Sequence, residues 1–423
     1  MGRLAECAAG VARSASNLGK VHLSGPALEA SLAPAGEFPS LDDICYMNTA
    51  SIGLMPRSAL AAEEKFQRQL GLYGTTWFDE PTEVGVLEQA RREGAALLGA
   101  PTEQVAVTTS VTEAISQIAW SLRPESGSNV VSIDLEFPTV TYPWMRVARD
   151  TGAEVRLVPA AGDPAKLSFE GLAEAVDQRT AAISVSHVQY STGFRYQLEE
   201  LSELAETNGA LLVVDASQSL GAVPIDLSSV RVDTLLCAGY KWLCGPFGAA
   251  LCYVGERLLE RLDPPFVGWK SAIDPWSLHA SSLRLASSVV ERLEYATMAY
   301  AAGVALAAAI RQIAMIGADR ILEHNLQLAS TLTEGLEHLG AQVITPREDE
   351  RRSGIVTARF PEHDGEQVAA WMNQSGVIVS PRFRSTRFSI HFFNSSDDVS
   401  FALDTLERVL ATGGPVARDR HTR

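Results

Sequence analysis

A lysine and an aspartate in this sequence each follow a run of apolar residues. Residues 211–214 are apolar and lead directly into Asp215, which is the pattern of a strand buried on both faces. A second apolar run leads to Tyr240 and Lys241 before glycines and a proline interrupt the chain. Ligands of open α/β sheets bind at the carboxyl ends of the strands, so we expect the two side chains to lie close together. A desolvated lysine amine forms a Schiff base and a carboxylate keeps a pyridine nitrogen protonated, so the pair predicts pyridoxal phosphate (PLP) chemistry.

A structural role is the alternative, in which Lys241 extends to solvent from a strand end and Asp215 caps a turn. The scarcity of lysine argues against it. Of the 35 basic residues only five are lysines, at positions 20, 65, 166, 241 and 270. A lysine kept within an apolar segment of such a chain therefore favours a chemical role.

The order and spacing of Asp215, Gln218 and Lys241 resemble the motif of the class V aminotransferases. These are fold-type I PLP-dependent enzymes and include cysteine desulfurases, kynureninases and isopenicillin N epimerases. The resemblance extends from about Tyr46 to about Leu410. It implies an α/β fold with a mostly parallel sheet of the seven-stranded type flanked by helices, a smaller α+β C-terminal domain, and a homodimer with shared active sites.

Composition limits the classes of partner. The chain of 423 residues is long enough for a large core, and 46% hydrophobic with 20% charged residues is typical of a soluble globular protein. A net charge of −16 argues against nucleic acid or an anionic membrane surface as a partner. No apolar run reaches the roughly 18 residues that span a bilayer, and the start of the chain lacks a long apolar signal region, so we expect a cytoplasmic enzyme. The cysteines lack metal-binding spacing, so no metal is expected.

Strand and helix patterns alternate between about residues 105 and 254, which predicts a mostly parallel sheet with helices on both faces. The expected strands end near residues 109, 136, 190, 215 and 241, at one rim of the sheet. We expect a flexible arm over 1–40, a large PLP-binding domain over 41–317, a small α+β domain over 318–410 and a disordered tail over 411–423. Ahead of the sheet, helices are predicted at 58–72 and 82–98, the second with Val84 and Leu87 facing inward.

The segment 105–116 has the pattern of a strand, a turn and a helix. Ser110, Val111 and Thr112 stand where the helix starts, so backbone N–H groups and hydroxyls there are suited to a phosphate. An ordinary N-cap with a capping box is the alternative. The family resemblance implies that this turn is the phosphate loop, and that Ser217 and Tyr240 also hold the phosphate.

The resemblance also assigns residues around the cofactor ring. Phe137 matches the position of a side chain stacked on the pyridine, with a core phenylalanine as the alternative. Thr139 follows within reach of the cofactor or the substrate. Gln189 or Tyr190 would lie near the ring oxygen, which Gln218 is also placed to contact.

Two further residues carry competing interpretations. His187 could act as a base, but a strand histidine in this motif is more often structural. Thr297 parallels a threonine that reaches the phosphate of a partner subunit, which implies the homodimer. An N-cap for the alanine-rich helix that follows is the alternative for Thr297.

Substrate contacts are expected from two regions. Arg387 matches the arginine of the family's Arg-x-Ser strand and would bind the α-carboxylate of an amino-acid substrate through both of its NH groups. The alternative is a solvated arginine that opens an edge strand. Arg382 or Arg384 in the preceding basic loop would add a second contact, which suits a substrate with extra carboxylates. The segment from Asn48 to Ser51 would touch substrate or belong to an ordinary strand-to-helix turn.

The type of reaction is the least determined feature. Cysteine desulfurases of this family need a nucleophilic cysteine before the Arg-x-Ser strand, and this chain has none between Gly354 and Asn394. We therefore expect a PLP-dependent lyase that forms a Cα carbanion and releases the sulfur substituent of an S-substituted cysteine by β-elimination, in a specialised pathway. Transamination and isopenicillin N epimerase-like racemisation stay open. A PLP-fold binding module is the non-enzyme alternative, which the presence of Lys241 and Asp215 disfavours.

Overall fold

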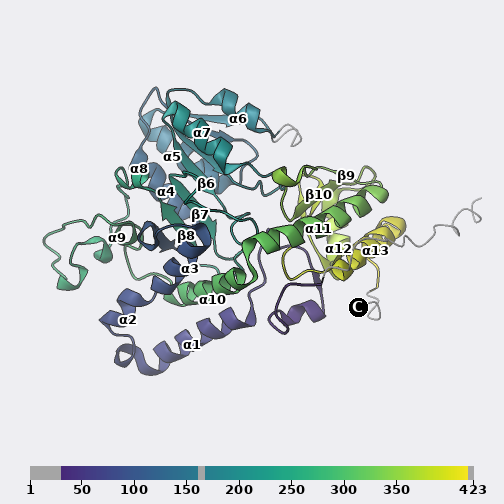
Figure 1. Ribbon diagram of the computed structural model, residues 1–423, viewed down its shortest axis with the longest axis horizontal. Coiled ribbons are helices and arrows are strands. Elements are labelled where there is room, and N and C mark those ends of the chain that lie inside the picture. The colour runs from purple at the N-terminus through teal and green to yellow at the C-terminus, as the bar shows by residue number, and fades with distance from the viewer. Residues whose placement is uncertain (1–29, 161–166, 418–423) are drawn as a thin grey trace, which may run out of the picture.

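The computed structural model describes residues 30–160 and 167–417 (Figure 1). Its largest sheet contains β2 (Val105–Thr108), β3 (Asn129–Ile133), β4 (Glu154–Val158), β5 (Thr180–Ser186), β6 (Leu211–Asp215), β7 (Thr234–Ala238) and β8 (Ala250–Val254). The strand order is β2-β8-β7-β6-β5-β3-β4. Only β8 runs antiparallel to its neighbours in this sheet, so the mostly parallel sheet is confirmed.

The strands of this sheet are apolar along their length because both faces are covered. In β6, Leu212 and Val214 pack into the core on one face, and Leu211 and Val213 pack into the core on the other. The first core is covered by α3 (Glu88–Leu98), α6 (Phe169–Ala175), α7 (Leu198–Asn208) and α10 (Tyr300–Ile316). The second is covered by α4 (Val111–Leu122), α5 (Pro138–Thr151), α8 (Glu256–Leu259) and α9 (Val289–Leu293).

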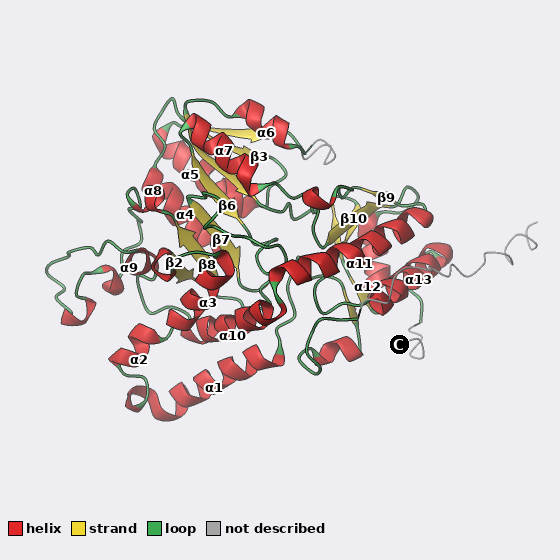
Figure 2. Ribbon diagram, viewed as in Figure 1, coloured by secondary structure: helices red, strands yellow, loops and turns green. Residues whose placement is uncertain are grey.

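A second, smaller unit is built mainly by C-terminal residues. Helix α11 (Ala318–His338) leaves α10 at Gly317 with a bend of 75°. The unit has a four-stranded antiparallel sheet in the order β12-β13-β10-β9, made of β9 (Gln342–Val343), β10 (Ile355–Arg359), β12 (Ser380–Arg382) and β13 (Ser385–Ser389). Helices α11, α12 (Gly365–Gln374) and α13 (Ser396–Thr412) close a core of its own. Figure 2 shows the two sheets as separate groups of strands surrounded by helices.

Residues near the start of the described chain join this smaller unit. Strand β1 (Cys45–Tyr46) pairs in parallel with β11 (Val377–Ile378), and Asn48 forms a bridge with Ser389. The predicted domain boundary at residue 318 stays a prediction, but residues 45–48, assigned to the large domain, pack with the C-terminal one. Most of the predicted arm and the end of the tail lie outside the described residues. The tail prediction was placed too early, because α13 continues to Thr412.

One predicted helix is wrong. Residues 82–98 form two helices, α2 (Glu80–Gly85) and α3, with Val86 and Leu87 between them. Leu87 is buried, but the Val84 side chain is 58% exposed. Both residues border a cavity of about 190 Å³ that contains Lys270, but only Leu87 packs into the core, because the helix is interrupted between them. The first predicted helix is present as α1 (Arg57–Tyr73).

The described helices were also compared with the requirements for a membrane span. No single helix within residues 30–160 and 167–417 is long and apolar enough to cross a bilayer. The pair α10 and α11 meets the length and composition requirement only when taken together across its bend.

Candidate active site

Strand ends of the large sheet surround a cavity of about 100 Å³. Its lining contains every residue predicted to hold the cofactor except Gln218 and Thr297. The lining residues are Thr109, Ser110, Val111, Thr112, Phe137, Thr139, Asp215, Ser217, Ala238, Tyr240, Lys241, Ala249 and Ala250. The expected convergence of strand ends at one rim is therefore present.

Lys241 and Asp215 face this cavity from neighbouring strands. Asp215 ends β6, and its Oδ1 accepts a hydrogen bond of 2.8 Å from the backbone N–H of Ser217. The Lys241 Nζ lies 5.5 Å from the centroid of the Phe137 ring. Burial lowers the pKa of Lys241, the Asp215 charge opposes this shift, and Arg387 adds to it. A lowered pKa leaves more of the amine unprotonated near neutral pH, which is its nucleophilic form.

The backbone of the lysine loop is fixed by close contact with the segment that enters from the smaller unit. The backbone N–H of Gly53 donates a hydrogen bond of 2.7 Å to the Tyr240 carbonyl. A Cβ at Gly53 would lie 2.0 Å from the Lys241 carbonyl oxygen. Only glycine therefore allows this approach, which holds the loop that carries Lys241.

Gln218 holds the same loop from below the cavity rather than lining it. Its Oε1 accepts a hydrogen bond of 2.7 Å from Trp242 Nε1, and its Nε2 donates to the Ala50 carbonyl at 2.9 Å. The Trp242 carbonyl is in turn 2.9 Å from His391 Nε2. Each end of the amide makes one hydrogen bond to the chain, and the contact of Gln218 with the cofactor ring stays a prediction.

The part of the cavity expected to bind the phosphate lies at the start of a helix and contains several hydroxyl groups. Ser110 is the N-cap of α4, and its Oγ accepts a hydrogen bond of 3.1 Å from the backbone N–H of Glu113, so the N-cap alternative is correct for its side chain. Thr112 and Thr139 hydroxyls are 2.7 Å apart. Ser217 Oγ accepts from the Ala238 N–H at 3.1 Å. Because α4 has twelve residues, its free N–H groups and dipole still favour an anion at this point.

An aromatic wall borders the cavity. Phe137 is 45% exposed, so it is not a core phenylalanine, and its ring lies edge to face with Tyr190 at 5.6 Å. The residue before it, Glu136, is buried and accepts hydrogen bonds from the N–H and the hydroxyl of Ser186. Burial raises the pKa of Glu136 to about 7, the Ser186 hydrogen bonds oppose the shift, and the Asp215 charge adds to it.

Gln189 and His187 are buried just outside the cavity lining. Neither Oε1 nor Nε2 of Gln189 has a hydrogen-bond partner among the described residues, although the residue is fully buried. Burial lowers the pKa of His187 to about 3, with the Arg195 charge adding to the shift, so its ring stays neutral. This neutral, enclosed ring supports the structural interpretation of His187.

Two arginines meet at the hydroxyl of Ser51. Arg387 donates to Ser51 Oγ at 2.7 Å, to Ser380 Oγ at 3.2 Å and to the Tyr190 carbonyl at 2.6 Å. Arg382 donates to the same Ser51 Oγ at 3.3 Å. Arg387 is fully buried in the middle of the inner strand β13, so the alternative of a solvated arginine that opens an edge strand is wrong. The strand begins two residues earlier than predicted, at Ser385.

Three other candidates make different contacts. Arg384 pairs with Asp364 at 3.4 Å on the surface and does not face Ser51. Asn48 Oδ1 is buried without a hydrogen-bond partner among the described residues. Thr297 is exposed, and the N-cap of α10 is Ala299, so the N-cap alternative for Thr297 is wrong. Its reach to a partner subunit stays a prediction.

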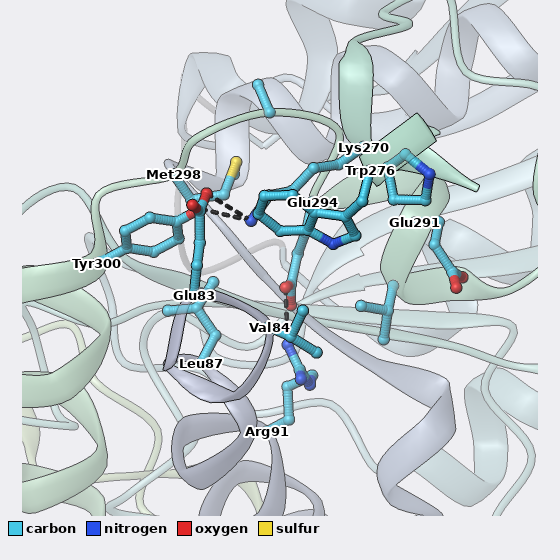
Figure 3. A pocket seen from close by; sticks show the side chains of 13 residues that line it. Glu83, Val84, Leu87, Arg91, Lys270, Trp276, Glu291, Glu294, Met298 and Tyr300 are labelled. Carbon is cyan, nitrogen blue, oxygen red and sulfur yellow. Dashed lines mark hydrogen bonds and ion pairs between the residues drawn. The ribbon is translucent and has the colours of Figure 1, made fainter. Parts of the chain in front are cut away.

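A second cavity, of about 190 Å³, contains the other half-buried lysine (Figure 3). Lys270 Nζ lies 3.0 Å from Glu83 Oε1 and donates a hydrogen bond of 2.5 Å to the Tyr300 hydroxyl. Below it, Arg91 pairs with Glu294 at 2.7 Å. The cations that line this cavity are therefore already neutralised by the chain.

Comparison with known proteins agrees with this geometry. The family model for aminotransferase class-V matches residues 54–400. The chain belongs to the class V aminotransferase family. The fold-type I fold and the PLP-dependent enzyme class predicted from the sequence are confirmed with it.

Individual relatives are distant. A probable cysteine desulfurase from Pyrococcus abyssi is 24% identical and covers 88% of this chain and 96% of its own. An isopenicillin N epimerase from Streptomyces clavuligerus is 29% identical, and the match covers 86% of this chain and 94% of the epimerase. The solved structure of a cystine C–S lyase with its product cysteine persulfide has a TM-score of 0.78 at 22% identity. The match covers 88% of this chain and 99% of the lyase chain. A variant of that lyase carries glycine covalently linked to its PLP cofactor.

The residues lining the cavity fit PLP. The site offers an amine with a lowered pKa, a buried carboxylate, an exposed aromatic ring and a helix N-terminus beside several hydroxyls. Sequence reasoning missed Gly53 and Glu136, and placed Ser51 only within a stretch. Gly53 follows a run of small residues, which was a signal that another segment of backbone approaches it closely. Nothing in the sequence showed that this segment is the loop that carries Lys241.

Proposed function

We propose that this protein is a PLP-dependent carbon–sulfur lyase that releases the sulfur substituent of an S-substituted cysteine by β-elimination, in a specialised pathway. Membership in the class V family and the likeness to a cystine C–S lyase support this proposal. The named relatives include cysteine desulfurases, which also cleave a bond to sulfur, and an epimerase.

Each part of the cofactor has residues suited to it. Lys241 would hold PLP covalently, Asp215 would face its ring nitrogen, and Phe137 would flank its ring. Ser110, Val111, Thr112, Ser217 and Tyr240 would hold its phosphate, with Thr139 beside them. When bound, PLP supplies an electron sink for the electrons released at the substrate Cα.

The chain's own groups then bind the substrate and move its proton. Arg387 is placed to bind the α-carboxylate, because a guanidinium offers two parallel donors to a carboxylate. Lys241 would be released from the cofactor when the amino group of the substrate replaces it, and its freed, unprotonated amine would take the proton from Cα. The lowered pKa of Lys241 favours that role near neutral pH. The bond from Cβ to sulfur breaks, and the sulfur leaves as a thiol once it receives a proton.

One observation favours elimination over persulfide formation on the enzyme. The basic hairpin between β12 and β13 contains Arg382 and Arg384 but no cysteine. The described cysteines at 45, 237, 244 and 252 are all buried. Burial also raises the pKa of Cys237 and Cys244, the two nearest in sequence to Lys241. The lack of an accessible thiolate among the described cysteines favours release of the sulfur-containing product into solution.

Absorption and product assays test this proposal together. The purified holoenzyme should show a band near the visible edge that shifts when S-substituted cysteines are added. Elimination should release thiol, pyruvate and ammonia in equal amounts. Inversion of Cα without pyruvate would favour epimerisation, and conversion of an added oxo acid into an amino acid would favour transamination. Either result without pyruvate would overturn the lyase proposal.

We also propose a homodimer in which Thr297 of one subunit reaches the phosphate of the other. The exposed position of Thr297, just before α10 and outside its own cavity, supports this. Light scattering of the purified protein should give twice the chain mass of 45.5 kDa. A stable monomer at micromolar concentration with full PLP content would contradict the shared site.

A further inference from the structure

The hairpin that closes the smaller sheet holds two cations without a counter-charge. Arg382 and Arg387 both donate to Ser51 Oγ, at 3.3 and 2.7 Å. Neither forms a salt bridge with any carboxylate in residues 30–160 and 167–417. The Nε atoms of both are buried and have no hydrogen-bond partner among those residues. Each arginine therefore has a buried Nε–H donor without an acceptor, and the two share the Ser51 hydroxyl as an acceptor. Unpaired buried donors on two cations indicate that the site binds an anion.

Electrostatics point the same way. Burial lowers the pKa of Arg387 well below its usual range, and the Arg382 charge adds to the shift. Two guanidinium groups at one hydroxyl repel each other, and burial strengthens the repulsion. The chain offers Ser51, Ser380 and a backbone carbonyl as partners, all of them neutral. Only a bound anion would compensate the charges.

The hairpin is also held in an unfavourable backbone conformation. Phe383 and Arg384 have φ values of 46° and 65°, in the left-handed region that residues other than glycine rarely adopt. This turn keeps Arg382 pointing inward to Ser51, while Arg384 turns outward to Asp364. Because Arg382 pairs with Ser385, Phe383 and Arg384 form a two-residue hairpin turn, and such a turn requires positive φ values at its centre.

The two arginines lie at different depths. Arg387 is fully buried, whereas Arg382 is partly exposed and stands 5.9 Å from the centroid of the Tyr190 ring. Phe383, 51% exposed, lies next along the same wall, 6.4 Å from Tyr190. The charges of both arginines contribute to the lowered pKa of Lys241, that of Arg387 more strongly. Arg387 is thus the inner contact and Arg382 the outer one.

We propose that the site takes an amino acid with a second carboxylate on its side chain, with Arg387 binding the α-carboxylate and Arg382 the distal one. This assignment rests on the proposed function only for the presence of an amino-acid substrate. The aromatic wall of Phe137, Tyr190 and Phe383 would border the part of the substrate between the two acids.

Simple dicarboxylic acids test this without any reaction. Succinate, glutarate and adipate have no amine and no sulfur, so their binding to the holoenzyme reports the arginines alone. Titration calorimetry should show at least one of them binding about tenfold more tightly than butyrate. Arg382→Gln should remove this preference and leave butyrate affinity within about twofold, whereas Arg387→Gln should weaken both.

Arg384→Gln is the matched control, because it removes a charge from the same hairpin without facing Ser51. It should keep the dicarboxylate preference. Arg382→Lys, which keeps the charge, should retain part of the preference and shows that the hairpin still folds. If Arg382→Gln weakens butyrate and the dicarboxylates equally, both arginines bind one carboxylate and the proposal is wrong. No preference in the unsubstituted enzyme also refutes it, whatever the pyruvate assay shows.

Discussion

Two cavities of this protein each contain a half-buried lysine among aromatic rings, but the chain treats their charges differently. Lys270 is paired with Glu83 at 3.0 Å and lies 5.0 Å from the Trp269 and Tyr300 ring centroids. Lys241 lies 5.5 Å from the Phe137 centroid and forms no ion pair among the described residues. Similar ring surroundings therefore do not distinguish a structural lysine from a reactive one, whereas the presence or absence of a direct ion pair does.

The arginines near each cavity repeat the difference. Arg91 is paired with Glu294 at 2.7 Å, and this carboxylate also accepts from the Val107 N–H at 2.9 Å. Arg387 meets only hydroxyls and a carbonyl. The cations of the Lys270 cavity are thus paired with carboxylates of the chain, whereas Arg387 has only neutral partners and is suited to an anionic ligand. An arginine that is already paired with a carboxylate of the chain binds an anionic ligand less strongly than an unpaired one.

The largest expected effect comes from exchanging the two lysines for alanine. Lys241→Ala should abolish both the absorption band of the bound cofactor and product release, because no other amine lines that cavity. Lys270→Ala should keep the band and lower the free energy of unfolding by about 1–3 kcal/mol, since Glu83 and Tyr300 lose a partly buried partner. Spectra and denaturant titrations of both variants check this. A normal band in Lys241→Ala would reject the assignment of the site.

Substitution of Arg387 should affect substrate binding, whereas substitution of Arg91 should affect stability. Arg387→Gln should raise KM for a carboxylate-bearing substrate by an amount equivalent to about 2–4 kcal/mol, because the substrate loses a buried charged partner. Arg91→Gln should leave KM unchanged and lower the free energy of unfolding by about 3 kcal/mol, because Glu294 remains buried without a counter-charge. Steady-state kinetics and denaturant titration measure the two effects. An unchanged KM in Arg387→Gln would remove Arg387 from the site.

Glu136 extends the comparison to a buried acid. It accepts hydrogen bonds from the backbone N–H and the hydroxyl of Ser186, which are neutral groups, and it forms no ion pair among the described residues. Its pKa is raised to about 7, so the native state holds a proton that the unfolded chain has already lost between about pH 4.5 and 7. Stability is therefore lost as pH rises through this window, by up to about 3 kcal/mol.

Glu136→Gln removes this titration and keeps an acceptor and a donor for Ser186. The free energy of unfolding of the variant, relative to the unsubstituted protein, should increase by up to about 3 kcal/mol between pH 4.5 and 8. Other titrating groups are common to both proteins and cancel in the difference. A difference that does not change with pH would show that Glu136 ionises normally.

The sequence predicted the cofactor end of the site better than the substrate end. Asp215 and Lys241 were found because each directly follows a buried strand, and strands of one parallel sheet end at one rim. The contacts of Arg387 with Ser51 and Tyr190 join three segments far apart in the chain, so no local pattern announces them. The helix predicted at 82–98 failed for a related reason, because its periodicity continues across a break that tertiary packing decides.

Gly53 shows what such long-range contacts leave out of sequence reasoning, and the smallest expected effect concerns this residue. Gly53→Ala places a Cβ 2.0 Å from the Lys241 carbonyl oxygen, so the lysine loop or the crossing segment must move. We expect a loss of about 1–3 kcal/mol in the free energy of unfolding, together with weaker cofactor binding.

Gly71→Ala is the control for this substitution. Gly71 lies within α1 with no atom near its Cβ position, so alanine there should stabilise the protein by up to about 1 kcal/mol through helix propensity. Thermal unfolding and PLP titration of both variants separate a general effect of alanine from contact with the lysine loop. If Gly53→Ala binds PLP and unfolds like the unsubstituted protein, close packing against Gly53 does not hold Lys241 in place. The position of Lys241 would then depend on other contacts of its loop, among them those of Trp242 with Gln218 and His391.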